Sequence, residues 1–182
     1  MPVVEDKHIV KKVIEGETEL FRLLVEKYQH PVYKAVFRIV GNIEDAKDVT
    51  QDVFIKAYES LYQYNDQYKF FSWLYRIAIN SALLFVKSQK KERSIDNMPI
   101  IPELADTTTD KEQWRHLIGQ CINQLPDKYK AVIVLKYYTK ISYNEIAETL
   151  GIPEKKVKSR LFDARKLLKE RLVKVDIFNL MQ

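Results

Sequence analysis

A short helix, a tight turn and a basic second helix are predicted in the stretch SYNEIAETLGIPEKKVKSRLFDARKLL. Ser142 and Glu145 have the S-x-x-E spacing of a capping box, and Gly151 tolerates the positive φ that a turn needs. The pattern indicates a helix-turn-helix, whose second helix enters the major groove of DNA. Its candidate DNA contacts are Lys155, Lys156, Lys158, Arg160, Arg165 and Lys166. A merely solvated basic helix is the alternative, and the joint occurrence of spacing and charge favours DNA.

A second candidate site concentrates aromatic rings beside basic residues. The rings are Tyr62, Tyr64, Tyr68, Phe70, Phe71, Trp73 and Tyr75, and Lys87, Lys90, Lys91 and Arg93 follow them. Bases of single-stranded nucleic acid stack on such rings for about 1–3 kcal/mol each, while cations hold the phosphates. Packing in a hydrophobic core is the competing interpretation, and for Phe70 and Trp73 the residue types alone favour the core.

Other chemistries have little support. The three histidines are far apart, and none has a metal-ligand spacing with Cys121, the single cysteine. The sequence has no Gly-rich phosphate loop and no nucleophile elbow. Asp48 and Asp52 are four residues apart, and an exposed acidic face toward a protein partner explains them better than a metal. We therefore expect no metal, no cofactor and no catalytic residue.

Composition and periodicity predict the elements that position these residues. The 182-residue chain is 46% hydrophobic with only 4 Gly, which favours an all-α protein. Residues 94–111, with Pro99 and Pro102, read as a flexible linker between two small helical domains, 1–93 and 112–182. In the first domain, apolar residues from Ala46 to Leu61 at steps of three and four predict an amphipathic helix within 42–64, and Pro31 is expected to interrupt or restart the preceding helical pattern.

Charge and targeting signals narrow the function classes. The formal net charge of +5 makes a polyanion such as nucleic acid a plausible partner. The first residues lack a signal-peptide pattern, no apolar run could span a bilayer, and a lone cysteine fits a reducing compartment. We expect a cytoplasmic protein that is not membrane-embedded.

Taken together, these motifs resemble bacterial sigma factors of the extracytoplasmic-function type, within the sigma-70 family. The resemblance rests on DAKDVTQDVFIKAY (45–58), FFSWLYRIAIN (70–80), INQLPDKYKAVIVLKYY (122–138) and residues 142–168. Their order and spacing cover the chain from about Phe21 to about Leu172.

The resemblance implies roles for each part. The family has no enzymatic activity and no small-molecule substrate; it binds core RNA polymerase, melts the −10 promoter element and reads the −35 element. The implied polymerase contacts are Asp48, Gln51, Asp52, Phe54 and Lys56. The implied −10 contacts are Tyr64, Tyr68, Phe70, Phe71, Trp73, Arg76, Asn80, Lys87, Lys90 and Lys91. Ser159 and Phe162 join the basic residues at the −35 element, helices over 112–138 help to bind the polymerase flap, and an anti-sigma factor is an expected partner.

The sequence departs from the family pattern at Phe71, Leu84 and Asp163, where a basic residue, an aspartate and a basic residue are usual. These departures affect the promoter sequence that is read, not the function. Two alternatives stay open: a helix-turn-helix regulator that binds duplex DNA alone, and a pure interaction module.

Overall fold

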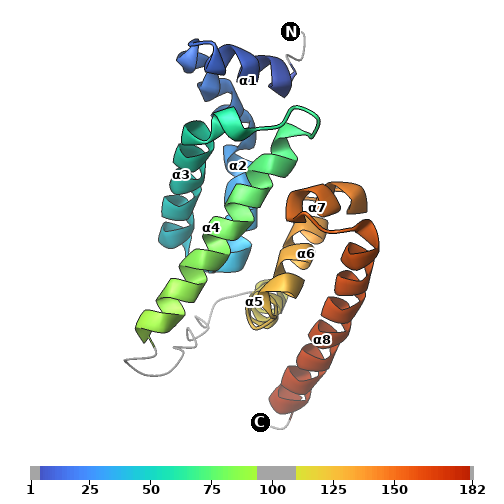
Figure 1. Cartoon of the computed structure of the whole chain (residues 1–182). Coiled ribbons are helices and arrows are strands. Elements are labelled where there is room, and N and C mark those ends of the chain that lie inside the picture. The colour runs from blue at the N-terminus through green and yellow to red at the C-terminus, as the bar shows by residue number, and fades with distance from the viewer. Residues whose placement is uncertain (1–4, 94–109, 181–182) are drawn as a thin grey trace.

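The computed structural model describes residues 5–93 and 110–180, and the side chains at 90–93, 110–113, 115–116 and 174–180 are not among those described. Every regular element in these ranges is a helix, which confirms the all-α prediction. Figure 1 shows the helices in two groups, here called the N-terminal lobe (5–93) and the C-terminal lobe (110–180). Most of the predicted linker lies outside the described residues, and positions 110 and 111 belong to the first helix of the C-terminal lobe.

The N-terminal lobe packs three long helices together. It contains α1 (Asp6–Ile14), η1 (Thr18–Leu20), α2 (Phe21–Val40), α3 (Ile43–Glu59), η2 (Leu61–Gln63) and α4 (Phe70–Arg93). The predicted stripe of α3 is buried, and Asn42 caps this helix by accepting hydrogen bonds from the backbone N–H groups of Glu44 and Asp45 at 2.8 and 3.1 Å. Helix α1 was not predicted from the sequence; it is anchored where the Tyr28 hydroxyl donates to Asp6 at 2.6 Å.

The expected interruption at Pro31 is wrong, because α2 continues through it. A proline inside a helix removes one backbone hydrogen bond and costs about 3 kcal/mol. Here Tyr28, Val32, Ala35 and Val36 continue one buried stripe across the proline. Burial of each large apolar side chain contributes about 1.5–3 kcal/mol, so packing outweighs the local penalty.

The C-terminal lobe contains the predicted helix-turn-helix. Its elements are α5 (Asp110–Asn123), α6 (Asp127–Tyr137), α7 (Tyr143–Leu150) and α8 (Glu154–Leu180). The capping box is confirmed: the Ser142 side chain accepts from the Glu145 N–H, and the Glu145 carboxylate accepts from the Ser142 N–H at 2.8 Å. Gly151 adopts φ +62° after α7, as the turn requires. The helix-turn-helix is therefore formed by α7 and α8.

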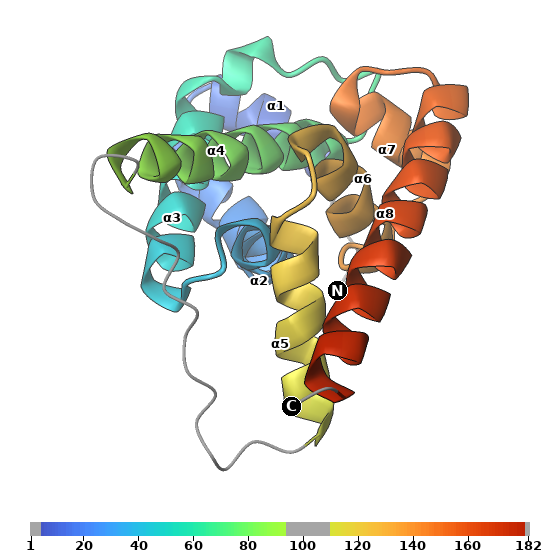
Figure 2. The ribbon, with the colours of Figure 1, turned by 90° about the horizontal axis from the view of Figure 1, so that it is seen from below.

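The two lobes pack directly against each other. Their buried apolar side chains form one continuous cluster that includes Ile39 of α2 and both Ile122 and Leu125 of the C-terminal lobe. At its edge the Arg38 guanidinium lies 4.6 Å from the centre of the Tyr138 ring. Viewed from below, α5 and α6 lie beside α2 (Figure 2), and α7 contacts α4. The predicted two-domain chain thus has an extensive contact between its domains.

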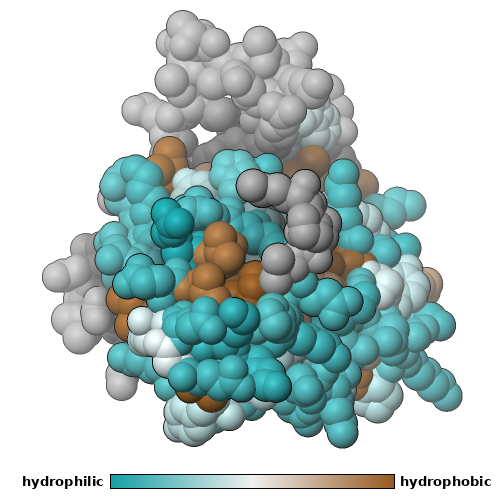
Figure 3. Space-filling view, turned by 90° about the horizontal axis from the view of Figure 1, so that it is seen from above, coloured by the Kyte–Doolittle hydropathy of each residue, from teal (hydrophilic) through white to brown (hydrophobic). Residues whose placement is uncertain are grey.

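Some classes of site find no support in the described part of the chain. Its helices are all too short or too polar to cross a membrane. Within the same residues no cluster of His, Cys, Asp or Glu is arranged to hold a metal ion. Seen from above, the surface is mostly hydrophilic, with smaller hydrophobic patches between polar side chains (Figure 3).

Candidate nucleic-acid and polymerase interfaces

The second helix of the helix-turn-helix presents a polar face to solvent. Val157, Leu161 and Ala164 are buried and fix α8 against the lobe. The side chains predicted to face DNA lie on the opposite side and its flanks, where most are exposed and Arg160 is half-buried; they are Lys155, Lys156, Lys158, Ser159, Arg160, Phe162, Arg165 and Lys166. Phe162 is 66% exposed, which is unusual for a large apolar residue on a basic surface. Its ring is available to contact a thymine methyl group, the apolar feature of the major groove.

The basic side chains of α8 have different surroundings. Lys158 forms an ion pair with Glu154, one turn earlier, at 2.6 Å, and this pairing raises the pKa of the lysine. Arg165 donates from Nε to the Leu161 carbonyl at 3.1 Å and lines a groove toward α5 and α6. Arg165 is therefore at the flank of the side that is predicted to face DNA, and Lys166 is nearer its centre.

Three rings form a compact cluster at the start of α4. The ring centres of Tyr64, Phe70 and Trp73 lie 5.6 to 5.8 Å from one another. Phe70 is only 2% exposed, so it packs in the core and supports the other two, as its residue type alone indicated. The Tyr64 hydroxyl donates to the Tyr68 carbonyl and fixes the preceding loop. Burial, with the nearby Asp66 carboxylate, raises the pKa of Tyr64 to about 12, so this phenol stays neutral.

The loop before α4 carries the rings that are most accessible. Tyr62 is 72% exposed and Tyr68 is 49% exposed, while Phe71 and Trp73 are half-buried. Phe71 lies under the Lys69 ammonium, which is 5.5 Å from the ring centre. The exposed tyrosines, rather than Phe70, have the surface needed for stacking on bases.

One face of α4 carries the predicted −10 contacts at helical spacing. Arg76, Asn80 and Lys87 are exposed, and Leu84, 65% exposed, lies between them. The backbone of Lys90 and Lys91 belongs to α4, but their side chains lie outside the described part. Arg76 points to α7: its Nε donates to the Thr149 carbonyl at 2.9 Å and its Nη2 donates to the Glu148 carbonyl.

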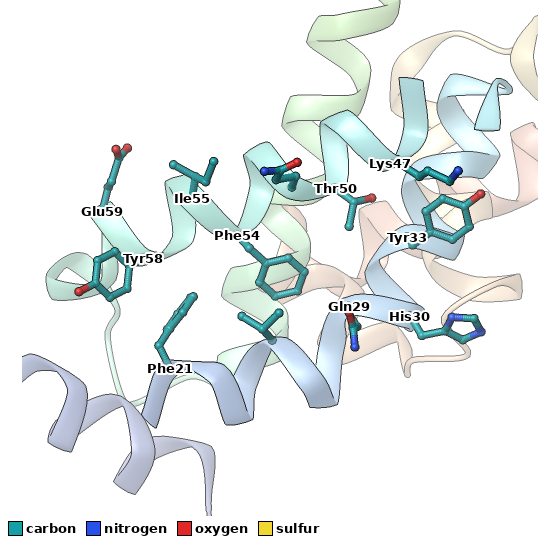
Figure 4. A pocket seen from close by; sticks show the side chains of 12 residues that line it. Phe21, Gln29, His30, Tyr33, Lys47, Thr50, Phe54, Ile55, Tyr58 and Glu59 are labelled. Carbon is teal, nitrogen blue, oxygen red and sulfur yellow. The ribbon is translucent and has the colours of Figure 1, made fainter. Parts of the chain in front are cut away.

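An apolar groove of about 990 Å³ runs between α2 and α3. Figure 4 shows Phe54 and Tyr58 of α3 directed toward α2, with Phe21 opposite Tyr58. The rings of Phe21 and Tyr58 meet edge to face, with centres 5.1 Å apart. Half-exposed apolar side chains such as Ile55 line the same groove. This geometry is suited to receiving the side chains of a partner helix.

The structure separates the predicted polymerase contacts into three groups. Gln51 and Phe54 line the groove, whereas Asp48 and Asp52 are exposed on α3 without lining it. Lys56 turns toward α4, where its Nζ donates to the Ser81 hydroxyl at 3.4 Å. Residues of α2, including Phe21, Val25 and Tyr33, also line the groove; they were not predicted from the sequence, because a groove depends on how two helices pack.

A second apolar groove lies in the C-terminal lobe, between α5, α6 and α8. Its lining residues include Ile118, Ile133, Tyr137 and Leu168. These residues lie partly within 112–138, the range that was expected to meet the polymerase flap. The contact with the polymerase flap itself stays a prediction.

Comparison with known proteins agrees with this architecture. The family described as Sigma-70 region 2 matches residues 24–92, and that described as Sigma-70, region 4 matches residues 115–168. The chain is 33% identical over 179 residues to the ECF RNA polymerase sigma factor SigW of Bacillus subtilis, covering 91% of this chain and 96% of that protein. It is 31% identical over 180 residues to the ECF RNA polymerase sigma-E factor of Escherichia coli K12, covering 92% and 94%.

Solved structures show the same fold. The structure of CnrH in complex with the cytosolic domain of CnrY has a TM-score of 0.72 at 24% identity, covering 94% of this chain and 98% of that one. The sigma factor RpoE from Bartonella quintana, in complex with the anti-sigma factor NepR, has a TM-score of 0.65 at 19% identity, covering 84% and 96%. Because the two domain matches and the relatives together span nearly the whole chain, this protein belongs to the extracytoplasmic-function group of the sigma-70 family of RNA polymerase sigma factors.

Proposed function

We propose that this sigma factor directs promoter-specific initiation by docking on core RNA polymerase through the α2–α3 groove and contacting promoter DNA with both lobes. The observation that carries the proposal is the presence, in one chain, of an exposed basic recognition helix and a separate aromatic and cationic surface at α4. A regulator that binds duplex DNA alone needs the first surface and has no use for the second.

In this proposal α8 reads the −35 element as intact duplex. Lys155, Ser159, Phe162 and Lys166 form the centre of its outer face, with Lys158 and Arg165 at one flank. Lysines held near phosphate oxygens contribute affinity without sequence information, and Phe162 contributes base discrimination through apolar contact. Asp163 is half-buried beside this face, where its carboxylate disfavours nearby phosphate and favours a cytosine amino group.

The N-terminal lobe opens the −10 element by differential binding. Unstacking and extruding a base costs a few kcal/mol, and a protein without ATP hydrolysis must recover this by binding separated strands more tightly than duplex. Tyr62, Tyr68, Phe71 and Trp73 offer ring surface for the extruded bases, while Phe70 holds Trp73 in place. Arg76, Asn80 and Lys87 are assigned to the phosphates and base edges that follow along α4, and Lys90 and Lys91 extend this assignment.

The α2–α3 groove is assigned to core polymerase. Phe54, Ile55 and Tyr58 offer an apolar centre, and the exposed carboxylates of Asp48 and Asp52 flank it as a polar rim. Two of the solved structures with this fold are complexes with CnrY and with an anti-sigma factor. An anti-sigma partner is accordingly proposed for this chain too, and the expected location is the cytoplasm, where promoters are transcribed.

Run-off transcription tests the proposal. Purified bacterial core polymerase is supplied with a promoter library, with and without the full-length protein, and transcripts are sequenced. We expect discrete start sites that depend on the protein and share two upstream elements. Tight binding of the protein to duplex DNA without polymerase, combined with no added transcripts, would support a simple helix-turn-helix regulator instead.

A further inference from the structure

We propose that Asp6, at the start of α1, is a positioning residue for capture of the −10 strand: through Tyr28 it holds the ring cluster of Tyr64, Phe70 and Trp73 in its binding arrangement. This inference rests on the assignment of the rings around the start of α4 to −10 DNA made above. Helix α1 precedes residues 24–92, which match Sigma-70 region 2, and it has no role in the function proposed so far. The proposal makes it part of the −10 site without placing it in contact with DNA.

The Asp6 carboxylate binds two side chains of α2 at once. One of its oxygens accepts from the Tyr28 hydroxyl at 2.6 Å, and the other accepts from the Lys27 ammonium at 2.6 Å. The Asp6 side chain is only 16% exposed, so little water competes for these oxygens. Hydrogen bonds to a charged group are roughly twice as strong as those between neutral groups. The start of α1 is therefore tied to one defined point on α2.

Tyr28 connects this anchor to the ring cluster. Burial, together with the hydrogen bond to Asp6, raises the pKa of Tyr28, so the phenol keeps its proton and remains a donor. Its ring packs against Phe70, with ring centres 5.7 Å apart. Phe70 in turn lies 5.6 Å from the ring centre of Tyr64 and 5.7 Å from that of Trp73. Because close-packed rings prefer particular tilts and leave little free space, a displacement of Tyr28 passes through Phe70 to the rings that face bases.

Helix α1 also lies next to the loop that carries the exposed rings. Figure 1 shows α1 at the same end of the lobe as the loop that precedes α4. A cleft of about 630 Å³ lies between them, and its lining includes Val10 and Ile14 of α1 together with Tyr64 and Asn65. Burial is the main cause of the raised pKa of Tyr64, and Asp6 is one of two carboxylates that add to it. Asp6 is therefore close to the ring cluster from the loop side as well as through Tyr28.

The test compares variants of the full chain, each assembled with saturating core polymerase. Tyr28→Phe removes one hydroxyl and keeps the ring, and Asp6→Ala removes the acceptor of that hydroxyl. The matched control for general loss of stability is Asn42→Ala in the same lobe. It removes the cap of α3, where the Asn42 side chain accepts from the backbone N–H groups of Glu44 and Asp45. The loss of a cap and the loss of a buried hydrogen bond destabilise a protein to a similar extent, so only a positioning role separates Tyr28→Phe from Asn42→Ala.

The probe is a labelled single strand with the −10 sequence of a promoter mapped by run-off transcription, and fluorescence anisotropy measures its binding well below the unfolding temperature. Because apparent affinity scales with the fraction of protein in the competent arrangement, Tyr28→Phe should bind about threefold more weakly than wild type, and Asn42→Ala should bind as wild type does. The double variant Asp6→Ala with Tyr28→Phe should bind no more weakly than Asp6→Ala, because both changes break one connection. Additive losses, or equal binding by Tyr28→Phe and Asn42→Ala, would overturn the positioning role alone. Absence of any promoter in run-off transcription with wild type would overturn the proposed function itself.

The fluorescence of Trp73 provides a second measurement that needs no DNA. The chain has two tryptophans, so in a Trp114→Phe background the emission reports Trp73 alone. Trp73 is half-buried in the described structure, and quenching by acrylamide measures how accessible its ring is. We expect Tyr28→Phe to make Trp73 more accessible to the quencher, and Asn42→Ala to leave its accessibility unchanged. Identical quenching of the parent protein and Tyr28→Phe would contradict the transmission from Tyr28 through Phe70 to Trp73.

Discussion

The salt dependence of −35 binding provides a quantitative test of which α8 side chains meet phosphate. Each protein–phosphate contact releases counterions, so the slope of log K against log salt concentration is about −0.9 per contact on duplex DNA. Lys166 lies near the centre of the exposed face of α8, one turn after the 66% exposed Phe162. The substitution Lys166→Gln should therefore make the slope less negative by about 0.9.

The expected change in affinity follows from that slope. Between 50 and 200 mM salt, a fourfold increase, one contact changes the affinity ratio by about 4 to the power 0.9, or about 3.5-fold. Wild type should lose about 3.5 times more affinity over this range than the variant. Glu154→Gln is the informative counterpart, because it removes the carboxylate that holds Lys158 at 2.6 Å and should tighten binding. Its slope should be no shallower than that of wild type.

Fluorescence anisotropy with labelled −35 duplex, titrated at several KCl concentrations, measures both quantities. Phe162→Ala is the uncharged control: its slope should equal that of wild type, while its preference for matched over scrambled duplex should decrease. An unchanged slope for Lys166→Gln, together with a changed slope for Phe162→Ala, would refute an orientation of α8 in which Lys166 faces phosphate.

Three further predictions concern the fold, the groove and pH. At Gly119 in α5 an added methyl group meets no atom within 4 Å, so Gly119→Ala should raise the free energy of unfolding by about 0.5–1 kcal/mol in urea titrations. Gly151 has φ +62°, so Gly151→Ala should lower the free energy of unfolding by about 1–2 kcal/mol. Gly41→Ala should lower the free energy of unfolding more than Gly151→Ala does, because its added methyl group also meets Asn123 Nδ2 at 3.1 Å. A larger loss for Gly151→Ala would contradict the contact between the lobes. Ile55→Ala should weaken binding to core polymerase by about tenfold, or about 1.4 kcal/mol. Ile43 is exposed on the same helix outside the groove, and Ile43→Ala should leave binding unchanged. Equal effects of the two substitutions in a competition assay would reject the groove as the polymerase-binding site. Burial alone would raise the pKa of Glu145, but hydrogen bonds from Lys69 and Ser142 lower it in the folded protein. The contribution of this carboxylate to stability is therefore fully present above the ordinary glutamate pKa of about 4.3, and it is lost as the pH falls through the lowered value. Thermal melts of wild type and Glu145→Gln should differ at neutral pH and converge in acid.

Local signals in the sequence predicted much of this protein. The capping box at Ser142, the turn at Gly151 and the stripe of α3 were predicted and are confirmed, because each depends on residues within one or two turns of a helix. The expectation at Pro31 was wrong because burial of its neighbours across the lobe outweighs a local rule. The α2–α3 groove could be predicted only in part, since Phe21 and Val25 gain their role from α3, a separate helix.

Helical periodicity assigns a face to each residue, but it does not say what covers that face. Arg76 illustrates the difference: the spacing 76, 80, 87 placed it on the polar side of α4, and this is correct. The sequence could not show that this polar side meets the C-terminal carbonyls of α7, more than 70 residues later. A guanidinium can donate hydrogen bonds either to a phosphate or to the C-terminal carbonyls of a helix, because both present oxygens with negative charge. The chemistry that makes Arg76 a predicted DNA contact therefore also suits the carbonyls that it contacts within the chain, and periodicity alone could not have distinguished these two partners.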